Sequence, residues 1–354
     1  MTWLVTGGAG FIGAHVVHAL HAAGEQVVVL DDLSTGIPDR LAGLDDVPVV
    51  RGSVQASSLV EKLLRDYEIG GVVHVAAKKQ PGESVERPLF YYRENVGGLE
   101  SLLRVMTEVG VDALVFSSSA STYGNQDTDV LTEDAVCRPE SPYGETKLAC
   151  EWLIAGVGRS SGLRYVNLRY FNAAGSARPD LADTGAFNLI PMVFERLTAG
   201  KPPLIFGDDY PTPDGTTIRD YIHVADIAAA HVAAARHLAD GSDARHTLNV
   251  GTGTGSSTRE VVETILDVSG YTDLRPEVLE RRPGDPAISI ASADRIRDVF
   301  GWAARHDLRR IITDAWEGWV HHHPEARHPE ARHPEARHPE ARHPEARHPE
   351  ARGD

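Results

Sequence analysis

Short apolar runs alternate with amphipathic segments through the first half of the chain. The runs at 3–6, 26–30, 72–76, 113–117 and 164–169 are rich in Val, Leu and other strand-forming residues, and we expect them to be buried strands. Apolar residues between the first two runs recur at helical spacing, and Gly24 then offers a helix stop; they are Phe11, Ile12, Val16, Val17 and Leu20. This alternation predicts βαβ units and a parallel sheet.

The pattern changes from about residue 176. Loops rich in Pro and Gly, such as 207–217, separate helical stretches such as 186–200. We therefore predict a first domain over 1–175 and a smaller C-terminal lobe over 176–320 that covers it. The run 246–253 resembles a strand again, so we expect the chain to return to the first domain near 215–255.

The end of the chain is a repeat. Six copies of His-Pro-Glu-Ala-Arg occupy 323–352. A proline at every fifth residue removes backbone donors too often for a helix, and a five-residue period matches neither helix nor strand. We expect 321–354 to be disordered or extended. Its histidines could bind nickel or zinc, but we favour a repeat expansion without a native role and predict no metal site.

Composition narrows the class of protein. With 354 residues, 42% of them hydrophobic, the chain is long enough for a sizeable core. Its apolar runs are shorter than a bilayer span, and its first residues enter a strand pattern without a basic leader. The two cysteines, Cys137 and Cys150, form neither a CxxC pair nor a disulfide framework. We expect a cytoplasmic protein.

The formal net charge of −16 disfavours two classes of partner, nucleic acids and anionic membranes. An anionic small molecule would need local cations or helix N-termini to offset this field. Arg219 and Lys79 are candidates for that reason.

A glycine motif follows the first predicted strand directly and opens the first predicted helix. Gly7, Gly10 and Gly13 let the backbone turn tightly, so that a pyrophosphate can approach the helix N-terminus beside Phe11 and Ile12. Asp31, at the end of the second strand, can accept hydrogen bonds from both hydroxyls of an adenine ribose and would repel a 2′-phosphate. These features predict NAD rather than NADP as cofactor. We expect the adjacent Asp32 to be a turn residue.

A second motif points to proton transfer. Tyr143 and Lys147 are spaced i and i+4 on one helix face, after a plausible helix start at 141–142. Ser119 ends the strand at 113–117, at the edge of the sheet where such folds bind ligands. Lowering a tyrosine pKa from about 10 by about 3 units needs roughly 4 kcal/mol of phenolate stabilisation, which a nearby ammonium and a cationic nicotinamide could provide.

Five motifs in order, TGGAGFIG, FSSSASTYG, SPYGETKL, LRYFNAAG and DYPTPDGTTIRDYIHV, make residues 1 to about 320 resemble the UDP-glucose 4-epimerase family of extended short-chain dehydrogenases. The resemblance implies a doubly wound parallel sheet of the Rossmann type with a smaller C-terminal substrate lobe. It also implies tightly held NAD, a homodimer, and inversion of C4 of UDP-glucose and UDP-galactose through a 4-keto intermediate.

The resemblance also implies roles for single residues. Tyr143 would take the proton of the sugar 4-hydroxyl, Ser119 would hold the 4-oxygen, and Lys147 would bond the nicotinamide ribose. Lys79 and Asn95 would lie near the cofactor, whereas we expect Lys78 to be solvated and Tyr221 to be a packing residue. Family contacts to the UDP-sugar fall on Asn172, Asn188, Leu189, Phe206, Arg219 and Asp285.

Three positions depart from the family pattern. Ser53 replaces an aspartate near the adenine amine, which would weaken that contact and ease NAD exchange. Glu94 replaces an asparagine. Ser289 stands where a bulky tyrosine restricts some members to sugars without an acetyl group, so we hypothesise that UDP-N-acetylhexosamines are also substrates.

Two alternatives remain. Another sugar-nucleotide 4-epimerase or a 4,6-dehydratase shares the fold and the serine-tyrosine-lysine set, but dehydratases carry an Asp-Glu pair where this chain has Ala120 and Ser121. A non-catalytic NAD-sensing protein would need only the fold.

Overall fold

A computed structural model describes residues 1–282 and 284–327 of the chain. Its centre is a sheet of seven parallel strands. In spatial order they are β11 (Arg245–Val250), β7 (Arg164–Tyr170), β5 (Ala113–Ser119), β4 (Gly71–His74), β1 (Thr2–Thr6), β2 (Gln26–Asp31) and β3 (Val49–Arg51).

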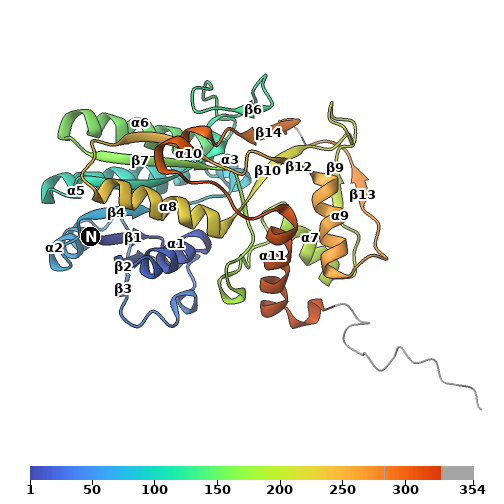
Figure 1. The fold of residues 1–354 in the computed structure, drawn as a ribbon, viewed down its shortest axis with the longest axis horizontal. Coiled ribbons are helices and arrows are strands. Elements are labelled where there is room, and N and C mark those ends of the chain that lie inside the picture. The colour runs from blue at the N-terminus through green and yellow to red at the C-terminus, as the bar shows by residue number, and fades with distance from the viewer. Residues whose placement is uncertain (283, 328–354) are drawn as a thin grey trace, which may run out of the picture.

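Helices cover both faces of this sheet, which is why its strands are apolar almost throughout (Figure 1). Side chains alternate between two cores: Trp3 and Val5 of β1 pack on one face, and Leu4 packs on the other. The first face is covered by α1 (Phe11–Ala22), α8 (Val224–Ala239) and α10 (Asp294–Phe300). The second is covered by α2 (Ser57–Asp66), α5 (Gly98–Val109) and α6 (Pro142–Ser161).

Short elements fill the connections around the carboxyl edge of the sheet. They are the 3-10 turns η1 (Pro38–Leu41), η3 (Ala120–Thr122) and η4 (Pro179–Leu181), the helices α3 (Pro81–Glu86) and α4 (Pro88–Tyr91), and the π-helical turn η2 (Tyr92–Gly97). The turn η2 runs directly into α5, so α4, η2 and α5 form one continuous helical segment.

A smaller lobe lies beyond this edge of the large sheet (Figure 1). Its helices, α7 (Leu189–Thr198), α9 (Thr258–Ser269) and α11 (Leu308–His322), enclose a core of their own. A five-stranded sheet comprises β12 (Gly255–Ser257), β10 (Ile218–His223), β14 (Ile288–Ala291), β6 (Val130–Leu131) and β8 (Asn172–Ala174). A separate parallel pair is formed by β9 (Leu204–Phe206) and β13 (Glu277–Leu279).

This architecture confirms the predicted fold class, a doubly wound parallel sheet with a smaller C-terminal lobe. After β10 the chain returns to the large domain through α8 and β11, and it returns a second time through α10, which the sequence pattern did not indicate. The pattern also missed β3, an edge strand of only three residues. None of the helices in the described part of the chain is long and apolar enough to cross a bilayer.

The predicted tail begins later than expected. Helix α11 continues to His322, and a 3-10 turn, η5 (Pro324–Ala326), follows it. Ala326 is fully buried, the Tyr271 hydroxyl donates to its carbonyl at 2.8 Å, and the His323 ring stacks on Trp319 at 4.1 Å. Apolar contact and this hydrogen bond therefore hold the first repeat against the small lobe, so our expectation was wrong for residues 321–327. Residues 328–354 lie outside the described part of the chain.

Candidate active site

The glycine turn between β1 and α1 is built as the motif predicts. Gly7 has a φ of +71°, and a Cβ at Gly13 would lie 2.0 Å from the Gly7 carbonyl oxygen. Gly10 begins α1 without a side-chain cap, so the first backbone N–H groups of the helix have no side-chain acceptor there. The turn thus offers a backbone cradle and a positive helix end, both suited to a pyrophosphate.

Asp31 lies at the end of β2 and is buried beside this turn. Its Oδ2 accepts from the Ala9 N–H at 2.9 Å and its Oδ1 from the Leu33 N–H at 2.8 Å. Each oxygen keeps a lone pair for a further donor. The carboxylate is therefore oriented by the backbone, which suits a residue that holds ribose hydroxyls.

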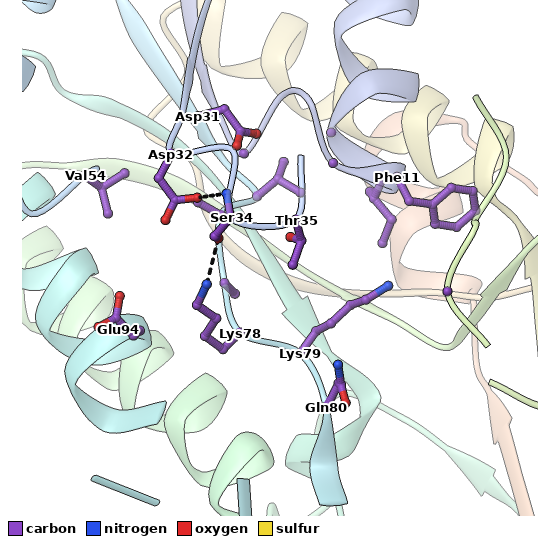
Figure 2. A pocket seen from close by; sticks show the side chains of 18 of the residues that line it. Phe11, Asp31, Asp32, Ser34, Thr35, Val54, Lys78, Lys79, Gln80 and Glu94 are labelled. Carbon is purple, nitrogen blue, oxygen red and sulfur yellow. Dashed lines mark hydrogen bonds between the residues drawn. The ribbon is translucent and has the colours of Figure 1, made fainter. Parts of the chain in front are cut away.

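Asp32, Ser34 and Lys78 form a small polar cluster beside Asp31 (Figure 2). Asp32 accepts from the Ser34 N–H at 2.8 Å, and the Lys78 ammonium donates to the Ser34 hydroxyl at 2.8 Å. Partial burial acts to raise the pKa of Asp32, but the hydrogen bonds from Ser34 and the charge of Lys78 lower it below its usual range. Asp32 is a turn residue as expected, whereas Lys78 is bonded rather than merely solvated.

These groups surround a cavity of about 510 Å³. Among the predicted cofactor residues, those that line it are Gly7, Gly10, Phe11, Ile12, Gly13, Asp31, Lys79, Tyr143 and Lys147. Asn95 does not line it. Its buried side chain instead accepts from the Lys78 N–H at 2.8 Å and donates to the Lys78 carbonyl and to Thr146, each at 3.0 Å. Asn95 thereby ties the loop after β4 to helix α6.

Helix α6 carries Tyr143 and Lys147. Ser141 caps the helix, with its hydroxyl accepting from the Gly144 N–H at 3.3 Å, and Pro142 occupies the first turn, as predicted. The buried Ser84 hydroxyl accepts from the Tyr143 N–H at 3.1 Å. The start of the helix is therefore fixed from two sides.

Burial governs the protonation of both side chains. It raises the pKa of Tyr143, while hydrogen bonding with Ser119 acts in the opposite direction. It lowers the pKa of Lys147 to about 8, with Cys150 and Glu151 opposing the change. The Lys147 ammonium donates to the Ser117 carbonyl at 2.7 Å and lies 4.9 Å from the centre of the Phe116 ring. In the structure itself, the phenol is thus less acidic than a tyrosine in water.

A second cavity of about 390 Å³ lies between the large sheet and the small lobe. Of the predicted substrate residues, those that line it are Ser119, Asn172, Asn188, Leu189, Phe206, Arg219 and Asp285. The Arg219 guanidinium donates to the Asp285 carboxylate at 2.6 Å and to the carbonyl of the preceding residue, Ile218, at 2.8 Å. Asp285 thus orients the guanidinium but also offsets part of its charge.

Ser289 is the exception among the predicted substrate residues. It lies in β14, in register with Arg219 of β10, and does not line either cavity. The space that a small residue leaves at this position does not open onto the cavity of the described structure. The geometry therefore gives no support to Ser289 as the residue that admits an acetyl group.

Sequence analysis missed several residues that line the cavities. Arg282 lies over the Phe206 ring at 3.9 Å in the second cavity, and Tyr221, which we took for a packing residue, also lines that cavity. Arg40 lines the first cavity and donates to the Ala182 carbonyl at 2.7 Å, while its buried Nε has no partner among the described residues. Arg282 stands three residues before Asp285, and that proximity is the signal that could have identified it.

The two cavities meet. Both are lined by Tyr143 together with Phe11, Ile12, Lys79, Tyr170, Asp183 and Phe187. Lys79 and Asp183 form an ion pair at this junction, with 3.8 Å between the ammonium and the carboxylate. One phenol thus borders both the cavity lined by the predicted cofactor residues and the cavity lined by the predicted substrate residues.

Comparison with known proteins accords with this geometry. A family model described as the NAD dependent epimerase/dehydratase family matches residues 3–251. The chain belongs to this family. Within the epimerase/dehydratase family, it is 44% identical over 321 residues to a UDP-glucose 4-epimerase of Azospirillum brasilense, covering 89% of this chain and 91% of that protein.

Solved structures give the same result. A UDP-glucose 4-epimerase of Stenotrophomonas maltophila, crystallised with NAD and formylated UDP-arabinopyranose, is 38% identical with a TM-score of 0.86, covering 92% of this chain and 99% of that chain. The UDP-Glc/GlcNAc 4-epimerase of Campylobacter jejuni is 34% identical with a TM-score of 0.80, covering 90% and 99% of the two chains. This epimerase/dehydratase chain therefore matches its relatives over both lobes.

Proposed function

We propose that the protein is an NAD-dependent UDP-glucose 4-epimerase, which interconverts UDP-glucose and UDP-galactose. The observation that carries the proposal is the junction of the two cavities at Tyr143. A reaction that oxidises and then reduces one carbon needs the sugar and the dinucleotide against the same acid-base group. Relatives named as UDP-glucose 4-epimerases support this substrate.

The residues around the first cavity fit NAD. The uncapped start of α1 and the glycine turn suit the pyrophosphate, and Asp31 suits the adenine ribose while disfavouring a 2′-phosphate. Bound NAD supplies reversible acceptance of a hydride from C4 of the sugar. Lys147 and Tyr143, at the other end of this cavity, would adjoin the nicotinamide riboside.

Tyr143 is the proposed base that takes the proton of the 4-hydroxyl and later returns it. Burial raises its pKa, so the phenolate needs cationic neighbours. The nicotinamide would bring one charge on binding, and the Lys147 ammonium of the same cavity would supply the other. Ser119, in contact with the same cavity, would hold the 4-oxygen throughout. The resulting 4-keto sugar accepts the hydride on its opposite face after it turns, which inverts C4.

The second cavity is suited to hold the nucleotide still during this turn. Phe206 offers a flat apolar surface, and Arg219 and Arg282 supply guanidinium groups for diphosphate oxygens. Elimination, by contrast, would need further acids or bases beside the sugar. The residues after Ser119 are Ala120 and Ser121, and Ser121 donates its backbone N–H to the Ser119 hydroxyl at 3.1 Å. This favours epimerisation over dehydration.

A homodimer is part of the proposal. Helix α6 exposes Trp152 by 65%, and the neighbouring α4 exposes Leu89 by 86%. Tyr92, which directly follows α4, donates to Glu145 of α6 at 2.9 Å, and Glu145 lies two turns before Trp152 on the same helix face. An exposed apolar face of this kind is typical of a subunit interface.

Analytical ultracentrifugation tests the homodimer. It should show a dimer for the wild type and a monomer for Trp152→Glu, and a monomeric wild type would refute the proposed dimer.

We also propose a cytoplasmic location. Both cysteines are free, Cys137 half-buried and Cys150 buried, which suits a reducing compartment. Recovery of the tagged protein in the cytosolic fraction of its own host cells would support this location, and recovery outside the cytosol would oppose it.

Incubation of the purified protein with UDP-galactose tests the main proposal. We expect UDP-glucose to accumulate to equilibrium, and Tyr143→Phe to lower kcat by about a hundredfold or more because it removes the acid-base group. A lasting 4-keto product would indicate a dehydratase. Absence of any product from protein that carries NAD would indicate a non-catalytic NAD-binding protein.

A further inference from the structure

The first cavity has two ends. One borders the second cavity and the proposed acid-base group, and we call it the catalytic end; the other, beyond Asp31, we call the adenosine end. Phe11 and Lys79, which border the second cavity as Tyr143 does, lie at one end, whereas Val54 and Glu94 lie at the opposite end, beyond Asp32 (Figure 2). Asp31 at the end of β2 fixes the place of the adenine ribose. If NAD binds as proposed, its adenine ring must therefore extend past the ribose toward this second end.

The polar groups at this end of the cavity differ in how many further hydrogen bonds they can accept. The Ser53 hydroxyl already accepts from the Gln55 N–H at 3.2 Å. The Gln55 side-chain amide donates to Glu94 at 3.3 Å and to the Arg93 carbonyl at 3.4 Å. The Glu94 carboxylate accepts from Gln55 through one oxygen and from the Arg93 guanidinium, at 2.9 Å, through the other.

Glu94 keeps the largest accepting capacity of this group. A carboxylate has about four lone-pair sites, of which these contacts occupy two. The Gln55 and Arg93 contacts also hold it at the cavity wall, and Val54 provides an apolar surface for a ring. Adenine presents one exocyclic amine, a donor of two hydrogens, and this wall offers it a charged acceptor.

We propose that Glu94 recognises the 6-amino group of the adenine of NAD and so determines which dinucleotide the protein retains. This assignment rests on the proposed function, because it requires NAD in the first cavity. The amine donates to a carboxylate oxygen of Glu94. A base with a carbonyl oxygen at position 6 places two acceptors against each other without a hydrogen between them, and the protein rejects it.

Competition between two dinucleotides tests the proposal. The purified protein is incubated with a large excess of NAD and nicotinamide hypoxanthine dinucleotide in equal amounts. The analogue has a carbonyl oxygen in place of the amine and a hydrogen on the adjacent ring nitrogen. Free nucleotide is removed, and retained nucleotide is released and quantified by mass spectrometry. We expect the wild type to retain NAD over the analogue by about tenfold or more, in line with a charged hydrogen bond against an unpaired acceptor.

Glu94→Gln should bring this ratio to within about twofold of one, because a carboxamide can accept from the amine or donate to the carbonyl oxygen. The ratio is measured only on protein that retains nucleotide, so a loss of stability does not imitate the result. Glu100→Gln removes the same charge from an exposed carboxylate of α5 and should leave the ratio at the wild-type value.

Two results would overturn the assignment alone: a wild-type ratio near one, or an unchanged ratio in Glu94→Gln, each with NAD retained and UDP-galactose converted. A wild-type protein that retains neither dinucleotide and converts no UDP-galactose would overturn the proposed function and the assignment together.

Discussion

Replacement of Lys147 by methionine should separate catalysis from stability. Lys147 is 3% exposed, and burial lowers its pKa from 10.5 to about 8. A shift of this size means that the ammonium costs the folded state about 3 kcal/mol at neutral pH. Methionine has a similar length and no charge, so this cost disappears in Lys147→Met.

The variant also loses contacts. The Ser117 carbonyl loses its donor at 2.7 Å, and the Phe116 ring loses a cation at 4.9 Å. Together these losses should offset about 1 to 2 kcal/mol of the gain. We therefore expect Lys147→Met to be more stable than the wild type by about 1 to 2 kcal/mol at pH 7. Its kcat should nevertheless fall by about a hundredfold or more, because the cation that lines the same cavity as Tyr143 is lost.

The sign of the pH dependence follows from the same shift. Between pH 8 and 10.5 the folded wild type binds fewer protons at Lys147 than the unfolded chain does, so the wild type gains stability as pH rises through this window. The advantage of the variant should be full below pH 8 and shrink toward pH 10. Lys147 also acts to lower the pKa of His74 and of Cys150, but burial lowers the pKa of His74 to about 3 and raises that of Cys150 to about 12. Both groups therefore stay neutral in the folded protein between pH 7 and pH 10, and their contributions cancel in the difference.

The assay is denaturant unfolding of nucleotide-free protein at pH 7 and pH 10, followed by circular dichroism. Lys62→Met, at an exposed lysine of α2, is the matched control and should change the free energy of unfolding by less than about 0.5 kcal/mol at either pH. A variant that is less stable than the wild type at pH 7, or an advantage that does not change with pH, would refute the assignment of Lys147 as a desolvated cation.

Three further predictions follow from single contacts. Gly13→Ala should abolish NAD retention, since its Cβ would lie 2.0 Å from the Gly7 carbonyl oxygen; normal NAD content in the purified variant would contradict this. Truncation after residue 320 should give a melting temperature several degrees below that of the chain truncated after residue 327, because it removes the buried Ala326; equal melting temperatures of the two truncated proteins would count against packing of the first repeat. Ser289→Ala should alter the ratio of kcat/KM for UDP-glucose and UDP-N-acetylglucosamine by less than about twofold, because Ser289 lines neither cavity, and a larger change would restore it as a specificity residue.

Local signals in the sequence identified the large domain well. The glycine turn, the strand end at Asp31 and the start of α6 depend on residues adjacent in the chain, and the structure builds each of them as predicted. The helical spacing of Tyr143 and Lys147 likewise places both on α6, within reach of one cavity.

Features that depend on distant contacts were missed or misjudged. Lys78 follows β4 and Ser34 follows β2, and they form a hydrogen bond because both strands flank β1 in the sheet. No local pattern in the sequence reveals this strand order. Tyr221 lines the second cavity because the small lobe closes over the sheet edge. The first repeat is ordered because Tyr271, more than 50 residues away, bonds to Ala326, whereas the repeat period alone indicated disorder.

The central claim is that one phenol serves a nucleotide sugar and a dinucleotide in adjoining cavities, so that hydride leaves C4 and returns to it within one enclosed site. Conversion of UDP-galactose deuterated at C4 tests this most directly, with the isotope in the UDP-glucose product measured by mass spectrometry and NMR. We predict that the deuterium is retained at C4 of the product and that Tyr143→Phe forms product at least about a hundredfold more slowly. Loss of the label to solvent, or full activity in Tyr143→Phe, would contradict the account.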